Sequence, residues 1–264
     1  MNENKLSKLM GLAINDYKMI NENEKIVVGI SGGIDSITLF MLLQNRLKRI
    51  LAGYQLYPVI VDNFNGEYDE QNKRIFRLSE FFNNELNCEL TIIKVKTAIK
   101  VFGNTIKKRD ACYLCAQKRR NELIKFADKN CCKKIALGHH KDDIIETTLM
   151  NMLFKRELSS MLPRLDIFEG KMSIIRPLAY FQKNQIEDYI YNREIEIPCF
   201  GEICPSKIVR RDSRREQVRE MVNSLSNKIP NIKNNIFAAF RNPKNDYLLN
   251  QYFNPKTSGL YKRP

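Results

Sequence analysis

Six consecutive residues near the start of the chain have the composition of a phosphate-binding loop. The hexapeptide Ser31-Gly32-Gly33-Ile34-Asp35-Ser36 follows an apolar run over 25–30 and precedes an apolar helical pattern. Paired glycines let the backbone turn sharply and present N–H groups to phosphate oxygens, and the start of a helix adds partial positive charge. Ser31 and Ser36 add hydroxyl donors. The alternative is a glycine turn that only lets a helix pack close to a strand.

An aspartate inside this hexapeptide points to a metal ion. A Walker loop carries a lysine after its glycines, whereas here no lysine follows and Asp35 stands within the loop. A carboxylate beside phosphates is repulsive unless a cation bridges the two, and Mg²⁺ commonly does so. Asp35 therefore predicts a magnesium ion at a bound phosphate.

Two cysteines separated by two residues indicate a second centre. Cys112 and Cys115 place two thiols in one turn, and Cys199 and Cys204 are the nearest residues that would complete a tetrahedral Cys₄ zinc site. The alternative is a [4Fe–4S] cluster held by three cysteines, with its fourth iron open to an exogenous ligand. Spacing alone does not separate the two. The remaining cysteines are expected to be small buried residues: Cys88, Cys131 and Cys132.

A third segment combines histidines and carboxylates. Gly138-His139-His140-Lys141-Asp142-Asp143 begins where an apolar run over 134–137 stops, and it holds both histidines of the chain. Asp142 or Asp143 would lie in the first turn of the following helix, where a carboxylate can cap N–H groups. In the other interpretation, one of the two carboxylates assists chemistry or holds a metal at the sheet edge.

The order of elements predicts where these segments meet. Strands are expected over 25–30, 56–61, 89–95 and 134–137, and helices over 37–50, 67–86, 116–129 and 142–155. This alternation predicts an α/β fold, an open parallel sheet with helices on both faces. Ligands of such folds bind beyond the carboxyl ends of the strands. Residues 31–36, Asp62 and 138–143 all follow such ends.

The rest of the chain divides by pattern. An N-terminal helix is expected within 1–24, a nucleotide-binding domain over 25–180, and a helical basic region with a ligand-bearing cysteine loop over 181–264. Within the last region we expect a helix near 182–191, the cysteine loop at 198–206 and a basic helix from about 212. The last residues, 254–264, have the composition of a loose basic tail.

The composition is that of a cytosolic protein with a polyanionic partner. The 264 residues include 44 lysines and arginines against 30 aspartates and glutamates, a net charge of +14, which favours nucleic acid as a partner. No apolar stretch approaches the roughly 18 residues of a membrane helix. Because MNENKLSKLM lacks a signal-sequence pattern, we expect the chain in the cytosol, where its seven cysteines would be reduced.

Three arginines at intervals of four residues are predicted to meet phosphates. Arg211, Arg215 and Arg219 would share one face of a helix, where like charges destabilise one another by about 0.2–0.5 kcal/mol per pair. A row of arginines is better accommodated against phosphates than against water. The alternative is a solvated basic helix.

These segments together resemble a known family. SGGIDS resembles the PP-loop of N-type ATP pyrophosphatases, which cleave ATP between its α and β phosphates and adenylate a substrate oxygen. CYLC followed by Arg119-Arg120, together with GHHKDDIIET, resembles the tRNA 2-thiocytidine synthetase family. The similarity covers most of residues 25–240. It implies thiolation of cytidine 32 in the anticodon loop, with ATP, Mg²⁺, an oxygen-sensitive [4Fe–4S] cluster, a sulfide or cysteine-desulfurase sulfur donor, and a homodimer.

The resemblance also assigns residues by position. Cys112 and Cys115 become cluster ligands. The third is Cys204, because the basic stretch after Cys204-Pro205 resembles the segment after the ligand in some relatives, and Cys199 is its alternative. From their positions in the chain alone, and not from the resemblance, Asp142, Asp143 and Arg119 are expected to assist catalysis. The residues expected around ATP are Ser31, Gly32, Gly33, Asp35, Ser36, Asp62, Gly138 and His139; for Asp62 an ordinary loop aspartate is the alternative.

Other functions share some of these features. A uridine-thiolating, amidating or lysine-adding PP-loop enzyme is a neighbouring possibility within the superfamily. The T-loop 2-thiouridine branch usually carries an N-terminal zinc module rich in cysteine and histidine, and residues 1–24 contain neither. A zinc-stapled RNA-binding protein with a decayed nucleotide site is the alternative outside enzymes, and the intact SGGIDS counts against decay.

Overall fold

The computed structural model describes residues 3–50, 53–63, 66, 69–95, 108–193, 196–198 and 214–248, the side chains of 108–112 excepted. The chain forms two compact units. The sheet unit comprises Met1–Lys141 and Leu162–Arg211, and the helical unit comprises Asp142–Met161 and Asp212–Pro264. The expected cysteine loop at 198–206, apart from Pro198, and the expected basic tail lie outside the described residues.

A six-stranded sheet forms the centre of the sheet unit, in the order β3-β2-β1-β4-β6-β5. The strands are β1 (Lys25–Ile30), β2 (Gln55–Asp62), β3 (Thr91–Lys94), β4 (Lys134–Leu137), β5 (Arg164–Ile167) and β6 (Met172–Ile175). All neighbours are parallel except β5, which pairs antiparallel with β6. The expected α/β fold is confirmed, with one antiparallel edge strand that the sequence did not indicate.

The position of β1 in the sheet indicates which edge binds the ligand. From β1 the chain proceeds to β2 on one side, while β4 pairs with β1 on the other. The loops that follow β1 and β4 therefore diverge at a switch in strand order, where α/β sheets leave a crevice at the carboxyl edge. The residues that occupy this edge are the hexapeptide after β1 and Gly138 after β4.

Helices cover both faces of this sheet. They are α1 (Glu3–Asp16), α2 (Ile34–Leu47), α3 (Asp69–Asn84), α5 (Lys108–Lys129) and α7 (Lys183–Tyr191). On one face, Leu123 and Ala127 of α5 share a buried cluster with Val27 and Val59 of the strands. Because side chains alternate along a strand, Ile26 and Val28 point to the opposite face, where α2 contacts β1, and α1 and α7 contact α2.

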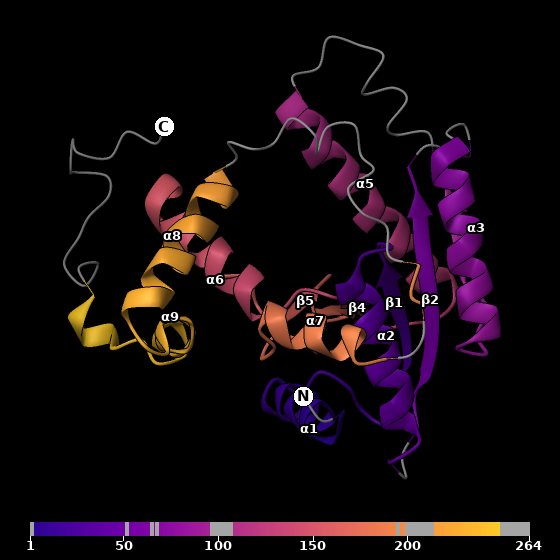
Figure 1. Ribbon diagram of the computed structural model, residues 1–264, viewed down its shortest axis with the longest axis horizontal. Helices are drawn as coiled ribbons and strands as arrows, with labels where there is room; N and C mark the ends of the chain where they lie inside the picture. Colours follow the sequence, from indigo (N-terminus) through magenta and orange to yellow (C-terminus); the bar gives the residue numbers. More distant parts are fainter. Residues whose placement is uncertain are drawn as a thin grey trace. The chain divides into compact units, whose positions relative to one another are not determined.

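Figure 1 shows these helices around the strands, with α2 beside β1 and α3 along the outer side of β2. The α2 and α3 helices meet through an aromatic pair, since the rings of Phe40 and Phe82 lie 4.9 Å apart. Both phenylalanines are buried. This packing fixes α2, and with it the hexapeptide at its start, against the sheet.

The helical unit is built from segments far apart in the chain. It contains most of α6 (Lys141–Met150), a π-helical turn over Asn151–Lys155, α8 (Arg214–Lys228), α9 (Ile232–Arg241) and a short 3₁₀ turn over Asn245–Tyr247. Val218 and Val222 of α8 and Phe237 of α9 are buried, and these two helices contact each other. Within the described residues, every helix is too short or too polar to cross a membrane.

The two units do not follow the expected boundaries at residues 24 and 180. The N-terminal helix α1 belongs with the sheet because it packs on α2, and α7 belongs there for the same reason. In contrast, α6 groups with the C-terminal helices although it directly follows β4 and its turn. A sequence pattern read along the chain does not detect such a grouping of distant segments.

Several element boundaries also differ from expectation. The helix expected from 37 begins at Ile34, which places Asp35 in its first turn. The helix expected over 116–129 begins at Lys108, so Cys112 and Cys115 lie inside α5 rather than before it. Of the cysteines expected to be buried, Cys132 is buried, Cys88 is half-buried and Cys131 is exposed. Cys131 ends the turn after α5 in the left-handed region, with φ at 54°.

Candidate active site

The hexapeptide after β1 forms a turn that its own serines stabilise. Gly32 has φ at +81°, which a residue with a side chain rarely adopts, and Gly33 is the N-cap of α2. The Ser36 hydroxyl donates to the carbonyl of Gly33 at 2.9 Å and accepts from the amide of Ser31 at 3.0 Å. A glycine N-cap brings no side chain to cap the first amides of α2, so the turn suits an external anion.

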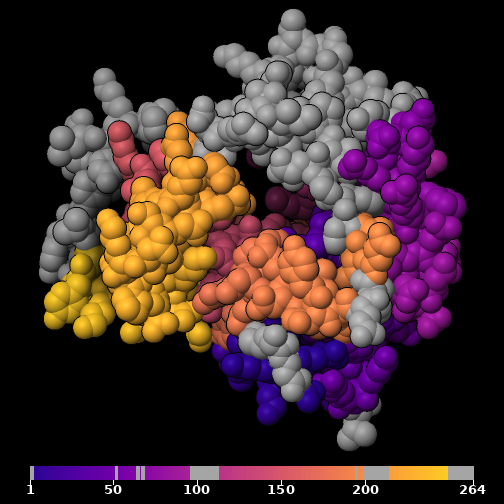
Figure 2. Space-filling model, in the orientation of Figure 1, coloured from indigo at the N-terminus to yellow at the C-terminus, as the bar shows by residue number. Residues whose placement is uncertain are grey.

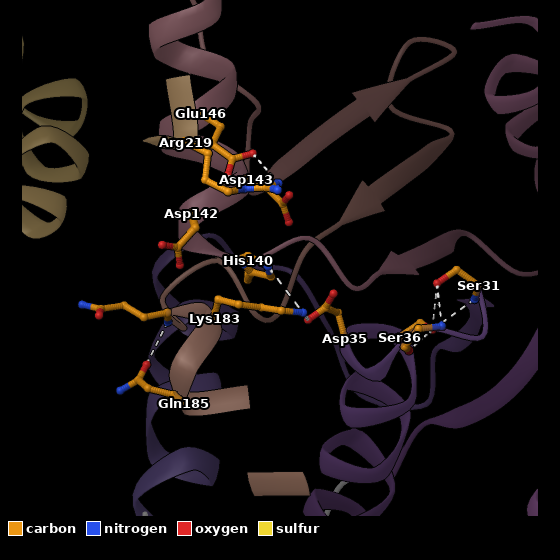
Figure 3. A network of polar contacts seen from close by, with 12 residues as sticks. Ser31, Asp35, Ser36, His140, Asp142, Asp143, Glu146, Lys183, Gln185 and Arg219 are labelled. Carbon is orange, nitrogen blue, oxygen red and sulfur yellow. Dashed lines mark hydrogen bonds and ion pairs between the residues drawn. The ribbon is translucent and has the colours of Figure 1, made fainter. Parts of the chain in front are cut away.

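Lys183 and His140 surround the aspartate of this turn. The Lys183 ammonium Nζ lies 2.6 Å from Oδ1 of Asp35, and Nε2 of the buried His140 lies 3.9 Å from the same oxygen. Figure 3 shows all three side chains converging from separate segments of the sheet unit. Asp35 is half-buried, with 31% of its side chain exposed, so its carboxylate fits the expected Mg²⁺ ligand. Sequence patterns did not single out Lys183.

Gly138 lies against the backbone of the hexapeptide. A Cβ added at Gly138 would lie 2.9 Å from the carbonyl carbon of Asp35 and 2.9 Å from the amide nitrogen of Ser36. Real Cβ atoms essentially never approach backbone so closely, and backbone cannot move aside as a flexible side chain can. The expected grouping of Gly138 with the hexapeptide is therefore present in the structure, and only glycine permits it. His139, the next residue, is half-buried.

Replacing this glycine should damage the site. We expect Gly138→Ala to lower the free energy of unfolding by about 1–3 kcal/mol, the usual range for overpacking, and to weaken ATP binding. Urea titration followed by circular dichroism measures the first effect, and titration calorimetry measures the second. Gly53→Ala is the control, because a Cβ at Gly53 would have no atom within 4 Å. Equal stability of the two variants would show that the close approach carries no constraint.

Asp62 closes a turn at the end of β2. Its side chain is fully buried, and its Oδ2 accepts a hydrogen bond from the amide of Gly66 at 2.7 Å. This contact gives the carboxylate a structural role in shaping the turn at the carboxyl edge. A role beside the adenosine of ATP stays a prediction.

The cysteine pair lies on α5, which runs antiparallel to the strands. Leu123 of α5 packs near the carboxyl end of β1. Its Cδ1 lies 3.2 Å from the position that a Cβ of Gly29 would take. Cys115 lies eight residues before Leu123, about 12 Å along the axis at 1.5 Å per residue. The topology therefore places Cys112 and Cys115 beyond the carboxyl edge of the sheet, the edge that also carries the hexapeptide.

The donors on α5 fit a metal centre in part. Residues three apart on a helix share a face, so positions 112 and 115 lie on one side of α5, and the Cys115 side chain is half-buried. Arg119 lies one turn further along and is exposed. No group of three histidine, cysteine or acidic residues suited to a metal occurs among the described residues. Cys199 and Cys204 lie outside that part of the chain.

In the helical unit, acidic residues of α6 pair with basic residues of α8 and α9. Glu146 is buried and accepts from Arg219, with Nε at 2.8 Å from Oε1 and Nη2 at 3.4 Å from Oε2. This hydrogen bond is the main reason that the pKa of Arg219 is raised above its usual value. Figure 3 shows the pair. The sequence did not single out Glu146.

The two aspartates of α6 have partners in the same unit. Oδ1 of Asp142 lies 2.5 Å from Nζ of Lys233, and Oδ1 of Asp143 lies 3.5 Å from Nη1 of Arg215. Both aspartates lie in the first turn of α6, as expected, and capping of the helix start by either carboxylate stays a prediction. A catalytic role of either aspartate stays a prediction.

Two members of the expected arginine row therefore meet carboxylates of their own chain. The Arg215 and Arg219 side chains remain 40% and 46% exposed, so a phosphate can still reach them. Arg211 lies outside the described residues. Contact of this row with tRNA stays a prediction, and the like charges do not need an external polyanion to balance them.

Comparison with known proteins agrees with this geometry. A family model described as a PP-loop domain matches residues 2–197. A tRNA-cytidine(32) 2-sulfurtransferase of Pseudomonas putida (strain W619) is 34% identical over 247 residues, covering 92% of this chain and 86% of the relative. A protein of the same name from Pelobacter propionicus is 32% identical over 250 residues, covering 94% and 88%.

A solved structure shares the fold. The U34-tRNA thiolase NcsA from Methanococcus maripaludis, solved with its [4Fe-4S] cluster, has a TM-score of 0.65 and 19% sequence identity to this chain. The match covers 89% of this chain and 78% of the thiolase. Because the relatives exceed 30% identity over nearly the full chain, the chain belongs to the tRNA 2-thiocytidine synthetase family of PP-loop ATP pyrophosphatases.

Proposed function

We propose that this protein is an ATP-dependent tRNA sulfurtransferase that converts cytidine 32 of tRNA into 2-thiocytidine. One observation carries the proposal: the phosphate-binding turn after β1 and the cysteine pair of α5 belong to the same edge of one sheet. An activated base can then be passed from the nucleotide to a sulfur source without leaving that edge. The names of the relatives supply the position of the nucleotide.

The first step uses the residues around the hexapeptide. The C2 oxygen of the pyrimidine attacks the α-phosphorus of ATP, the bond to the bridging oxygen breaks, and pyrophosphate leaves with the electron pair. Backbone amides at the start of α2 and the hydroxyls of Ser31 and Ser36 would face the phosphates, and Asp35 would hold Mg²⁺. Donors fixed before the reaction stabilise developing charge without reorganisation.

The second step exchanges oxygen for sulfur. Hydrosulfide forms a bond to C2, the C2–O bond breaks, AMP leaves with the oxygen, and the proton of the sulfur goes to solvent. A [4Fe–4S] cluster held by Cys112, Cys115 and Cys204, or Cys199 in its place, would supply an iron site for sulfide. Arg119, one turn from Cys115, offers positive charge near that sulfur. Sulfide itself or a cysteine desulfurase is the expected donor.

Access to the base favours a loop substrate. A pyrimidine must leave its stack before C2 can reach the α-phosphate, and unstacking costs less in an anticodon loop than in a duplex. The exposed fractions of Arg215 and Arg219 suit them to the tRNA backbone. We further propose a cytosolic protein and a homodimer.

A reconstituted reaction tests this function. Anaerobically purified protein is incubated with ATP, Mg²⁺, sulfide and an unmodified tRNA transcript, and the digested nucleosides are analysed by mass spectrometry. We expect 2-thiocytidine from a transcript with cytidine at position 32 and none when that cytidine is replaced by uridine. Appearance of 2-thiouridine from either transcript would favour a uridine-thiolating enzyme, and ATP-independent binding without any thionucleoside would favour the RNA-binding alternative.

A further inference from the structure

A lysine from a distant segment lies at the centre of the phosphate-binding turn. Lys183 is 148 positions from Asp35 in the sequence, yet its ammonium lies 2.6 Å from that carboxylate. Figure 3 shows the side chain extended toward Asp35 from the start of α7. The Lys183 side chain is 36% exposed, so the ammonium is also accessible from solvent.

The fold holds this lysine in place. Lys183 is the first residue of α7, whose N-cap Gln182 forms a capping box with Gln185, with the Gln182 amide donating to Oε1 of Gln185 at 2.9 Å. The residue before the cap, Phe181, accepts from the amide of Lys141 at 2.8 Å, which ties this segment to the turn after β4. In addition, α7 packs on α2, and its orange surface is visible in Figure 2. These hydrogen bonds and this packing fix the start of α7, and with it the position of Lys183.

The chemistry of the site calls for a cation of this kind. A Walker loop supplies a lysine to the β- and γ-phosphates from its own sequence, and the hexapeptide here contains none. Pyrophosphate leaving from ATP accumulates negative charge, which a fixed ammonium stabilises. An ammonium has three donors, so a hydrogen bond to Asp35 does not exhaust its capacity.

From this placement we infer that Lys183 is the phosphate-binding lysine of the site, supplied by α7 instead of by the loop. The inference rests on the proposed function, since it takes the bound anion to be the triphosphate of ATP. Lys183 contacts Asp35 in the structure, and it would bind the β- and γ-phosphates when that carboxylate is engaged with Mg²⁺. AMP lacks these phosphates and would not use the lysine.

The inference is tested by binding, without catalysis. Titration calorimetry on the anaerobically purified full chain measures the dissociation constants of AMP and of α,β-methylene-ATP with Mg²⁺. We expect Lys183→Ala to weaken binding of the ATP analogue about 10-fold to 100-fold, the range for one charge-assisted hydrogen bond. Binding of AMP should weaken less than about 3-fold. Lys183→Arg should recover part of the loss. Lys171→Ala, at an exposed lysine of the β5–β6 turn, should bind both nucleotides like the parent protein.

A purely structural role of Lys183 gives a different result. If the lysine only neutralises Asp35, then Lys183→Ala should weaken binding of AMP and of the ATP analogue equally. This loss of affinity should vanish in an Asp35→Asn background. Either result would overturn the inference. If Lys183 binds the β- and γ-phosphates, then Lys183→Ala still lowers the affinity for the ATP analogue relative to AMP in the Asp35→Asn protein. If the parent protein binds neither nucleotide, the result would instead contradict the proposed function itself.

Discussion

Asp35→Ala is expected to lower the rate of pyrophosphate release by at least about 100-fold, the effect typical of removing one charge-stabilising group from an active site. The carboxylate is the group at the start of α2 that suits Mg²⁺, and its loss leaves the ammonium of Lys183 and the ring of His140 without their shared anion. A coupled assay of pyrophosphate release, in the presence of tRNA, measures the rate.

Stability controls separate this effect from unfolding. Asp35 is partly exposed, so we expect its removal to change the free energy of unfolding by less than about 1 kcal/mol. Asp128→Asn, at an exposed aspartate near the end of α5, should leave both stability and rate unchanged. Pyrophosphate release by Asp35→Ala at the parent rate would remove the metal role assigned to this residue.

Loss of either cysteine of α5 should abolish thiolation while sparing ATP binding. The anaerobically purified parent protein is expected to be brown with about four irons per chain, as one [4Fe–4S] cluster requires. Cys112→Ser and Cys115→Ser should be pale and iron-poor, because serine replaces a thiolate ligand with a weakly coordinating hydroxyl. Iron and acid-labile sulfide analysis, together with nucleoside mass spectrometry, measures both effects.

The other cysteines provide the control for this experiment. Cys131→Ser changes an exposed thiol before β4 and should keep the colour, the iron and the thiolation activity. Colourless parent protein with one zinc per chain would contradict the cluster and support a zinc site. The same measurement on Cys199→Ser and Cys204→Ser decides which of these residues is the third ligand, since only the true ligand should be needed for iron.

The sequence predicted the centre of the sheet better than its edge. The strands β1 and β4 were found with their observed bounds, because both are apolar runs buried on the two faces of a parallel sheet. The β5–β6 hairpin was missed, because its strands have four residues each and β5 carries Arg164 and Asp166. So short and polar a strand has no apolar run by which to be recognised.

The site shows a similar division between local and distant contacts. The hexapeptide and Gly138 were recognised because their residue types and their places after strands are local signals. Lys183 and Glu146 were missed, because each acts through a partner more than 70 positions away. The α7 helix was predicted, but nothing in its sequence indicates that its first side chain reaches Asp35. Such contacts depend on how helices pack, which local patterns do not encode.

The charged edge strand has a consequence for self-association. β5 is the last strand on its side of the sheet, and an edge strand can recruit a strand of another molecule through its backbone. Its short length and its Arg164–Asp166 ion pair, with Nε at 2.9 Å from Oδ1, make that margin a poor template. We therefore expect that copies of this protein do not associate by extending the sheet across β5 from one copy into the next.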